Sequence, residues 1–176
     1  NDLGEVAGAS LANALETNAS LTALNLRHNN LGNVGGVNLA NALDRNTTLE
    51  NLNLGYNNLG HVGGVNLANA LGRNTTLLTL NLANNNLGAV AGSAIANALE
   101  TNSSLTALDL EDNDLGEDFG VNLANALETN SSLTALNIEG NEISADTIGR
   151  IDQLLSGREV PEVNPYLGIR VALPGV

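Results

Sequence analysis

Short stretches in which every second residue is apolar alternate along the chain with longer stretches of helical period. In LTALNL (21–26), Leu24 and Leu26 alternate with Ala23 and Asn25, the pattern of a strand with one buried face. Similar stretches begin at positions 21, 49, 77, 105 and 133, so the pattern recurs in 28-residue units. We therefore predict five strands, centred on 23–27, 51–55, 79–83, 107–111 and 135–139.

The second half of each unit predicts a helix. Gly36, Leu39, Ala40 and Leu43 are spaced i, i+3, i+4 and i+7, which places them on one helix face, whereas Asn38 and Asn41 face outward. We call a set of equivalent positions in successive units a column. Glycine recurs in the column of Gly36, at Gly8, Gly64, Gly92 and Gly120. Because glycine weakens a helix, this column predicts a close approach, which we expect between helix and sheet.

One strand and one helix per unit require a parallel sheet, since the chain returns through a helical crossover. Strands stack about 4.8 Å apart and helices about 8–10 Å apart, so one stack accommodates both only by curving. We therefore predict an arc with the sheet on its concave face and the helices on its convex face. Residues 1–156 would form this solenoid, as a half unit (1–20) and units starting at 21, 49, 77, 105 and 133.

The repeated pattern LxxLxLxxNxLG followed by GxxLAxAL resembles the leucine-rich repeat. The similarity is to the long subtype found in ribonuclease inhibitor and in the receptor ends of Nod-like receptors. It implies an α/β fold, a right-handed leucine-rich-repeat solenoid. It also implies that one asparagine after each strand turns inward to bond the backbone of the loop. Here that column, the turn column, is Asn29, Asn57, Asn85, Asn113 and Asn141.

A second asparagine column matches the acceptor motif for N-glycosylation. We call it the helix-end column: Asn18, Asn46, Asn74, Asn102 and Asn130, each followed two residues later by Ser or Thr. Asparagine often ends a helix in the left-handed conformation, and Thr47-Thr48 suits the run into the next strand. We interpret the motif as a requirement of the fold rather than an array of glycans.

The two ends differ from the repeats. Ser144 is expected to begin a last helix that Gly157 stops. The alternating residues 167–173 then predict a strand within a capping segment, 157–176, that covers the sheet edge. Residues 1–20 have a helix without a preceding strand, so we expect further repeats or a neighbouring domain at that end.

Charge and composition restrict the functions that the chain can have. The net charge is −13, and residues 99–176 carry −11 of it, which disfavours nucleic acid and favours a basic protein partner. Cysteine is absent, no stretch suits a membrane span, and no catalytic or metal motif appears. We therefore expect a monomer without cofactor, metal or enzymatic activity, and a cytoplasmic rather than secreted location.

Two adjacent columns just after the strands vary most between units. We call their residues the rim: Arg27-His28, Gly55-Tyr56, Ala83-Asn84, Glu111-Asp112 and Glu139-Gly140. Variable residues on a rigid curved sheet suit a binding surface, although drift at unconstrained positions gives the same pattern. The predicted partner-binding residues are Arg27, His28, Asn53, Tyr56, Asn81, Asn84, Asp109, Glu111, Asp112 and Glu139, with Tyr56 as the anchor.

The leading hypothesis is a non-enzymatic protein-binding module that belongs to a larger receptor- or effector-like protein. An alternative is the substrate-recognition region of a multidomain enzyme, such as a ubiquitin ligase. A third is an engineered or consensus-like repeat scaffold, against which the divergent fifth unit argues.

Overall fold

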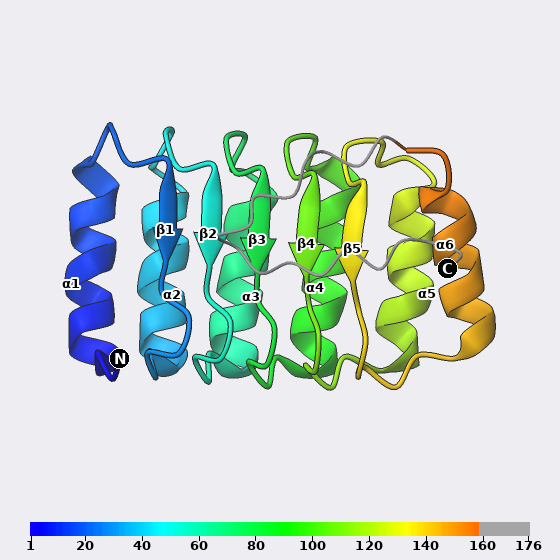
Figure 1. Cartoon of the computed structure of the whole chain (residues 1–176), viewed down its shortest axis with the longest axis horizontal. Coiled ribbons are helices and arrows are strands. Elements are labelled where there is room, and N and C mark those ends of the chain that lie inside the picture. Colours follow the sequence, from blue (N-terminus) through cyan, green and yellow to red (C-terminus); the bar gives the residue numbers. More distant parts are fainter. Residues whose placement is uncertain (159–176) are drawn as a thin grey trace.

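In the computed structural model, which describes residues 1–158, helices and strands alternate along the chain. The strands form one layer and the helices lie behind them as a second layer (Figure 1). The helices are α1 (Gly4–Thr17), α2 (Gly32–Leu43), α3 (Gly60–Leu71), α4 (Gly88–Thr101), α5 (Gly116–Leu127) and α6 (Ala145–Leu155). The strands are β1 (Ala23–Asn25), β2 (Asn51–Asn53), β3 (Thr79–Asn81), β4 (Ala107–Asp109) and β5 (Ala135–Asn137). This is the α/β repeat solenoid that the sequence predicts.

The sheet is parallel, in the order β1-β2-β3-β4-β5, and each strand residue pairs with its counterpart in the next repeat, as Leu24 does with Leu52. The strands are shorter than predicted and end at the column of Asn25. The reason is that the Gly55 N–H, which would continue the ladder from β2 to β1, donates to Asn53 Oδ1 (3.0 Å) instead. Single bonds continue beyond the strand ends, as from His28 N to Gly55 O (3.0 Å).

The core lies between the two layers and is built from leucine and alanine. Leu52 from β2 and Leu39 from α2 are fully buried, and Gly36, Ala40 and Leu43 are buried beside them. The predicted buried face of the helix is thus confirmed. Asn41 is exposed and Asn38 is half-buried on the opposite side.

The glycine column serves helix–helix packing, so the expected approach of helix to sheet is wrong. A Cβ added to Gly36 would lie 2.8 Å from the Gly63 Cα of the next helix. One added to Gly64 would lie 2.7 Å from the Ala91 Cβ. Glycine therefore lets neighbouring helices approach more closely than side chains would allow. A smaller helix spacing lies nearer the strand spacing, which reduces the curvature that the stack requires.

The turn column satisfies the backbone of the buried turns, as the resemblance implies. Asn57 Nδ2 donates to Leu54 O (2.9 Å) in its own repeat and to Leu26 O (2.9 Å) in the preceding one. Asn57 Oδ1 accepts from Asn29 N (3.1 Å) and Leu31 N (3.4 Å). The same bonds recur at Asn85, Asn113 and Asn141. Each asparagine side chain thus supplies the hydrogen-bond partners that the backbone of a buried turn would otherwise lack.

The helix-end column satisfies the backbone at the other turn of each repeat. The left-handed conformation predicted for its asparagines is wrong. No member of this column has a positive φ, and Asn18 and Asn102 are extended. Asn46 Nδ2 donates to Leu15 O (2.9 Å), and its Oδ1 accepts from Leu49 N (2.7 Å). Four of the five amides are only 4–7% exposed, whereas Asn18 is exposed. The motif therefore has a structural cause, though not the expected one.

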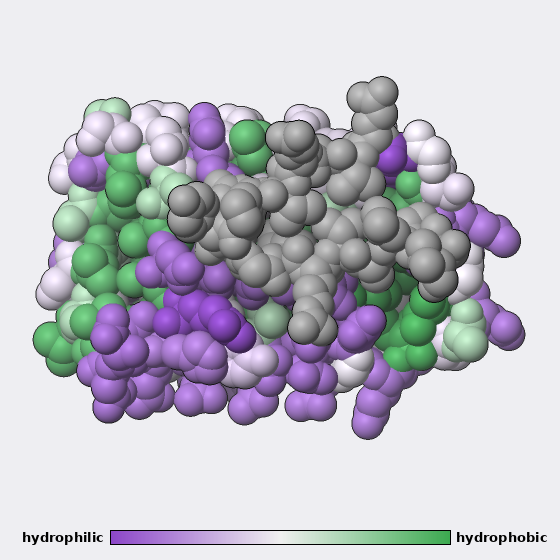
Figure 2. All heavy atoms as spheres, in the orientation of Figure 1, coloured by the Kyte–Doolittle hydropathy of each residue, from purple (hydrophilic) through white to green (hydrophobic). Residues whose placement is uncertain are grey.

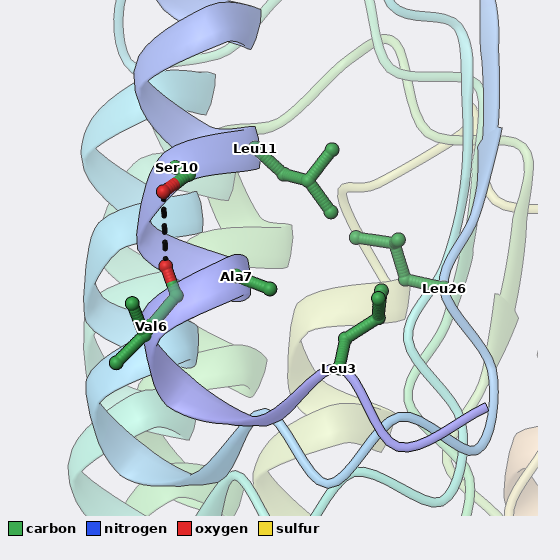
Figure 3. A pocket seen from close by; sticks show the side chains of 6 residues that line it. All are labelled: Leu3, Val6, Ala7, Ser10, Leu11 and Leu26. Carbon is green, nitrogen blue, oxygen red and sulfur yellow. Dashed lines mark hydrogen bonds between the residues drawn. The ribbon is translucent and has the colours of Figure 1, made fainter.

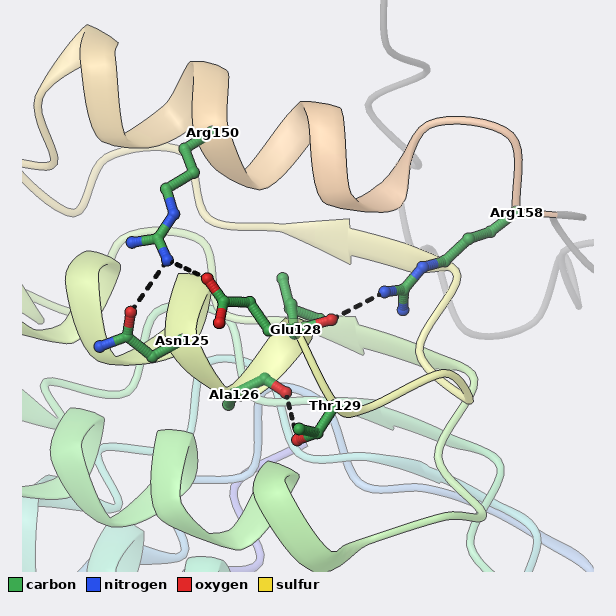
Figure 4. Close-up of polar contacts among 7 residues, drawn as sticks. Asn125, Ala126, Glu128, Thr129, Arg150 and Arg158 are labelled. Atoms are coloured by element: carbon green, nitrogen blue, oxygen red, sulfur yellow. Dashed lines mark hydrogen bonds and ion pairs between the residues drawn. The ribbon is translucent and has the colours of Figure 1, made fainter.

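At the C-terminal side, an arginine takes over the role of the helix-end column. Ser144 caps α6 by accepting from Thr147 N, and Gly157 (φ +80°) follows the helix end, both as predicted. Arg158 holds the position in the last unit that corresponds to Asn130, and it donates to Leu127 O (3.0 Å) and Leu133 O (2.7 Å). In Figure 4, Arg150 of α6 contacts Asn125 and Glu128 of the preceding repeat. The predicted strand at 167–173 lies outside the described residues.

We expect Leu52→Ala to lower the free energy of unfolding by roughly 2–5 kcal/mol, because it leaves a cavity between the layers. Asn38→Ala is the control, since the Asn38 amide bonds only Val34 O within its own helix. It should change stability by less than about 0.5 kcal/mol. Chemical denaturation measures both, and equal losses would contradict the assignment of the two helix faces.

The glycine column gives a second prediction. Gly36→Ala should destabilise the protein by about 1–3 kcal/mol, because the new Cβ meets the backbone of the next helix. Gly72 has φ −63° and its added Cβ would lie no closer than 3.7 Å to another atom. Gly72→Ala should therefore stabilise the protein by up to about 1 kcal/mol. Thermal and denaturant unfolding should give changes of opposite sign for the two variants.

Candidate binding surface

The last residue of each strand positions the rim. We call this set the strand column: Asn25, Asn53, Asn81, Asp109 and Asn137. In each repeat its side-chain oxygen accepts from the backbone N–H two residues later, at 3.0–3.1 Å. This side-chain turn ends the strand and fixes the backbone of the first rim residue. This hydrogen bond explains why the strand column is Asn or Asp in every repeat. The sequence alone did not reveal that role.

Three of the predicted partner-binding residues belong to the strand column and are buried in the structure: Asn53, Asn81 and Asp109. The other seven lie in the rim. Arg27, His28, Tyr56, Asp112 and Glu139 are exposed, and Asn84 and Glu111 are half-buried. The fold therefore brings the rim residues together along one edge of the strand layer and places the strand column beneath them. In Figure 2, hydrophilic side chains gather along the loops that follow the strands.

The second rim residue has a left-handed backbone in every repeat. Its φ is +57° at His28, +60° at Tyr56, +55° at Asn84, +51° at Asp112 and +70° at Gly140. Asparagine, aspartate and glycine tolerate this conformation, whereas histidine and above all tyrosine adopt it less readily. The first two repeats thus carry bulky rings at positions where the backbone favours small residues.

The rings at these two positions are in contact with each other. The centroids of His28 and Tyr56 are 4.2 Å apart, and their planes are inclined by 27°. The Arg27 guanidinium carbon lies 4.6 Å from the centre of the Tyr56 ring, within the range of a cation–π interaction. Tyr56 remains 37% exposed. Arg27, His28 and Tyr56 therefore form one exposed aromatic and cationic cluster, which we call the aromatic cluster.

The rim of β4 and β5 carries acids instead. The Asn84 amide donates to Asp112 Oδ2 (3.3 Å), and the Asn137 amide donates to Glu111 Oε2 (3.2 Å). Burial raises the pKa of Asp109 to about 6, and the charge of Glu111 adds to this rise. Hydrogen bonds to Asp109 from the Glu111 N–H and the Asn137 side chain act in the opposite direction. We call Asp109, Glu111, Asp112 and Glu139 the acidic end.

The residues within 1–158 contain no group of three or more His, Cys, Asp or Glu side chains placed to hold a metal ion. In the same range, no helix is both long and apolar enough to cross a membrane. The rim itself presents a stacked ring pair with one cation at β1 and β2, and carboxylates at β4 and β5.

Comparison with known proteins identifies the family. A model described as Leucine Rich repeat matches residues 17–40, 45–68, 73–96, 101–118 and 129–146, together more than half of the chain. The chain belongs to the leucine-rich repeat family. A search of curated proteins found no match.

Solved structures share the arrangement of this leucine-rich repeat chain. One is described as "Leiomodin-1 Actin-Binding Site 2", with a TM-score of 0.72 and 22% identity over 85% of this chain and 86% of that one. Another is a tropomodulin C-terminal domain from Caenorhabditis elegans, with a TM-score of 0.74 and 18% identity over 84% and 90%. At this identity the likeness shows the fold.

Asp109 should make the stability of the protein depend on pH. Because its folded-state pKa of about 6 lies above the ordinary value of about 3.9, ionisation of this carboxyl opposes folding. The stability that depends on a protonated Asp109 carboxyl is therefore present at pH 4 and is lost as the pH rises through 6. The free energy of unfolding of the wild type minus that of Asp109→Asn should fall by about 2 kcal/mol between pH 4 and 7. A difference that stays constant over this range would contradict the assignment.

Proposed function

We propose that this chain is a non-enzymatic protein-binding module whose partner docks on the concave face, along the rim. The observation that supports this proposal most directly is the backbone at Tyr56. A tyrosine at φ +60° is unfavourable, and the same column holds Asn84, Asp112 and Gly140 in later repeats. Backbone strain concentrates at binding sites, where a particular side chain is needed at a particular place.

The aromatic cluster has the properties of an anchor for a protein partner. Tyrosine and arginine are enriched among the residues that carry most of the binding energy at protein interfaces. The stacking of Tyr56 on His28, and the position of Arg27 over the ring, hold the three side chains in place before a partner arrives. Less conformational entropy is then lost on binding.

The acidic end gives the surface a direction. Adjacent strands lie about 4.8 Å apart, so β2 and β4 are separated by about 10 Å. About three residues of an extended segment span that distance. The partner would thus place an apolar or aromatic residue at Tyr56 and a basic residue near Glu111 and Asp112. Because acids repel phosphate, the same charges argue against nucleic acid.

The neighbours give a precedent for protein binding by this fold. The description of the leiomodin-1 structure names an actin-binding site. Folds host unrelated functions, so this likeness makes actin one candidate partner to test and supports no rim residue in particular. We further propose that the module acts as a monomer within a larger receptor- or effector-like protein.

The association and dissociation rates of a partner, with actin among the proteins tested, distinguish the role of the aromatic cluster from that of the acidic end. Tyr56→Ala should mainly speed dissociation, by ten-fold or more, because an anchor acts after docking. The double change of Glu111 and Asp112 to alanine should mainly slow association, with the largest effect at low salt, because exposed charges steer the encounter.

The matched control is Asn69→Ala, an exposed asparagine of α3 on the helix layer. It should leave both rates unchanged. The proposal would be overturned if Asn69→Ala changed the binding rates while Tyr56→Ala and the double change of Glu111 and Asp112 left them unchanged. That result would place the partner on the helices.

A further inference from the structure

A polar hollow opens where the strands begin, and we call it the strand-start hollow. It measures about 380 Å³ and is lined by the segments that precede β1, β2 and β3. Its lining includes one carboxylate, one leucine and several hydroxyls: Glu50, Leu78, Ser20, Thr47, Thr48 and Thr76. The rim lies at the opposite ends of the same strands, up to about 20 Å from Glu50 along β2. The hollow is therefore separate from the surface of the proposed function.

Another hollow, between α1 and β1, differs in chemistry. In Figure 3, Leu3 and Leu11 from the helix side and Leu26 from the strand side point toward one another across it. Its lining contains no charged residue. Of these two hollows, the strand-start hollow is therefore the one that can select a ligand by its charge.

Two residues of the strand-start hollow depart from the pattern of their column. Glu50 and Leu78 stand where positions 22, 106 and 134 hold threonine. Thr106 Oγ1 donates to Leu78 O (3.0 Å) and Thr134 Oγ1 donates to Thr106 O (3.3 Å), so each of these threonines ties its repeat to the preceding one. Neither a carboxylate nor a leucine can make that bond. Two adjacent repeats thus lack a stabilising contact and present an exposed acid beside an exposed leucine.

Two threonine hydroxyls of the hollow offer acceptors rather than protons. Thr48 Oγ1 donates to Leu21 O (3.3 Å), and Thr76 Oγ1 donates to Leu49 O (3.2 Å). A hydroxyl has one proton and two lone pairs, so both oxygens can still accept but have no further proton to donate. Within residues 1–158, the Glu50 carboxylate has neither an ion-pair nor a hydrogen-bond partner. The lining is therefore rich in acceptors and carries one negative charge.

A cationic group with several N–H donors on an aliphatic stem fits such a lining. The acceptors come from adjacent repeats, about 4.8 Å apart, and a planar guanidinium with five N–H donors reaches more than one of them at once. Long basic side chains also cover apolar surface with their methylene groups, and Leu78, which is 38% exposed, offers that surface beside Glu50. Arginine meets both requirements.

We propose that the strand-start hollow is a docking site for an arginine side chain of a protein partner. The guanidinium donates to the Glu50 carboxylate and to the hydroxyl oxygens of Thr48 and Thr76, and the stem covers Leu78. The Thr47 hydroxyl is exposed and has no partner in the described part of the chain, so it can donate to a peptide carbonyl beside that arginine. This last contact favours a polypeptide over a free guanidinium compound. The site goes beyond the proposed function and does not depend on it.

The tripeptide acetyl-Gly-Arg-Gly-amide is the probe, and its citrulline analogue, which has nearly the same shape without the charge, is the control. In an NMR titration of the whole protein at physiological salt, the backbone amide signals of Thr48, Glu50 and Leu78 should shift and saturate at millimolar arginine peptide. The citrulline peptide should bind about five-fold more weakly, because it lacks the charge that faces Glu50. The compound n-butylguanidinium should bind about three-fold more weakly than the arginine peptide, because it has no peptide group for Thr47.

Matched variants test the location. Glu50→Gln should weaken binding of the arginine peptide about five-fold, whereas Glu100→Gln, which removes the same charge from an exposed residue of α4, should leave it unchanged. Leu78→Thr, which introduces the residue that Thr106 and Thr134 hold in the same column, should weaken binding about three-fold. Thermal melts verify that all three variants fold.

The acidic end of the rim is a competing site for the same peptide, so the double change of Glu111 and Asp112 to alanine is included. It should leave the shifts at Thr48 and Leu78 unchanged, whether or not a partner binds the rim. The proposal is overturned if millimolar arginine peptide does not shift these signals, or if the citrulline peptide binds equally well. It is also overturned if Glu50→Gln and Glu100→Gln weaken binding equally, or if n-butylguanidinium binds as tightly as the arginine peptide.

Discussion

The structure depends on the satisfaction of buried backbone groups by side-chain amides. A repeat that contains one strand and one helix turns twice, and stacking places both turns against neighbouring repeats, where water cannot solvate their N–H and C=O groups. Asparagine solves this problem because one short side chain both donates and accepts. Asn57 joins two repeats at one turn and Asn46 joins two at the other. Without them, apolar packing would have to offset several unpaired polar groups in every repeat.

The same asparagines explain why the chain needs so few other polar contacts inside. The three ion pairs among residues 1–158, such as Arg45 with Glu16, lie at the surface between neighbouring repeats and add little in water. The core of the described residues is mainly leucine and alanine, together with Ile95, Ile151 and the fully buried Phe119. The glycine column then allows neighbouring helices to approach each other closely.

A rigid scaffold of this kind tolerates local strain. The backbone at the second rim residue is left-handed in every repeat, because the turn that follows the strand column requires it. Three repeats use residues that suit this conformation, and two use His28 and Tyr56, which stack on each other instead. The scaffold fixes where these rings lie, and the fold itself does not need rings at these positions. Under the proposed function they would serve as an anchor, and the strain would then serve recognition rather than folding.

The sequence by itself determined the parallel sheet, its register and the buried helix face, because a strict repeat period leaves one way to stack leucines such as Leu52 and Leu39. It also determined the inward turn of Asn57, through resemblance to the family. It did not reveal that Gly36 faces the next helix, that the helix-end asparagines are not left-handed, or that Asn53 supports the rim from below. Periodicity assigns a residue to a face, but only the tertiary structure decides which neighbour that face meets. Hydrogen bonds between repeats and the exposure of Tyr56 depend on that neighbour.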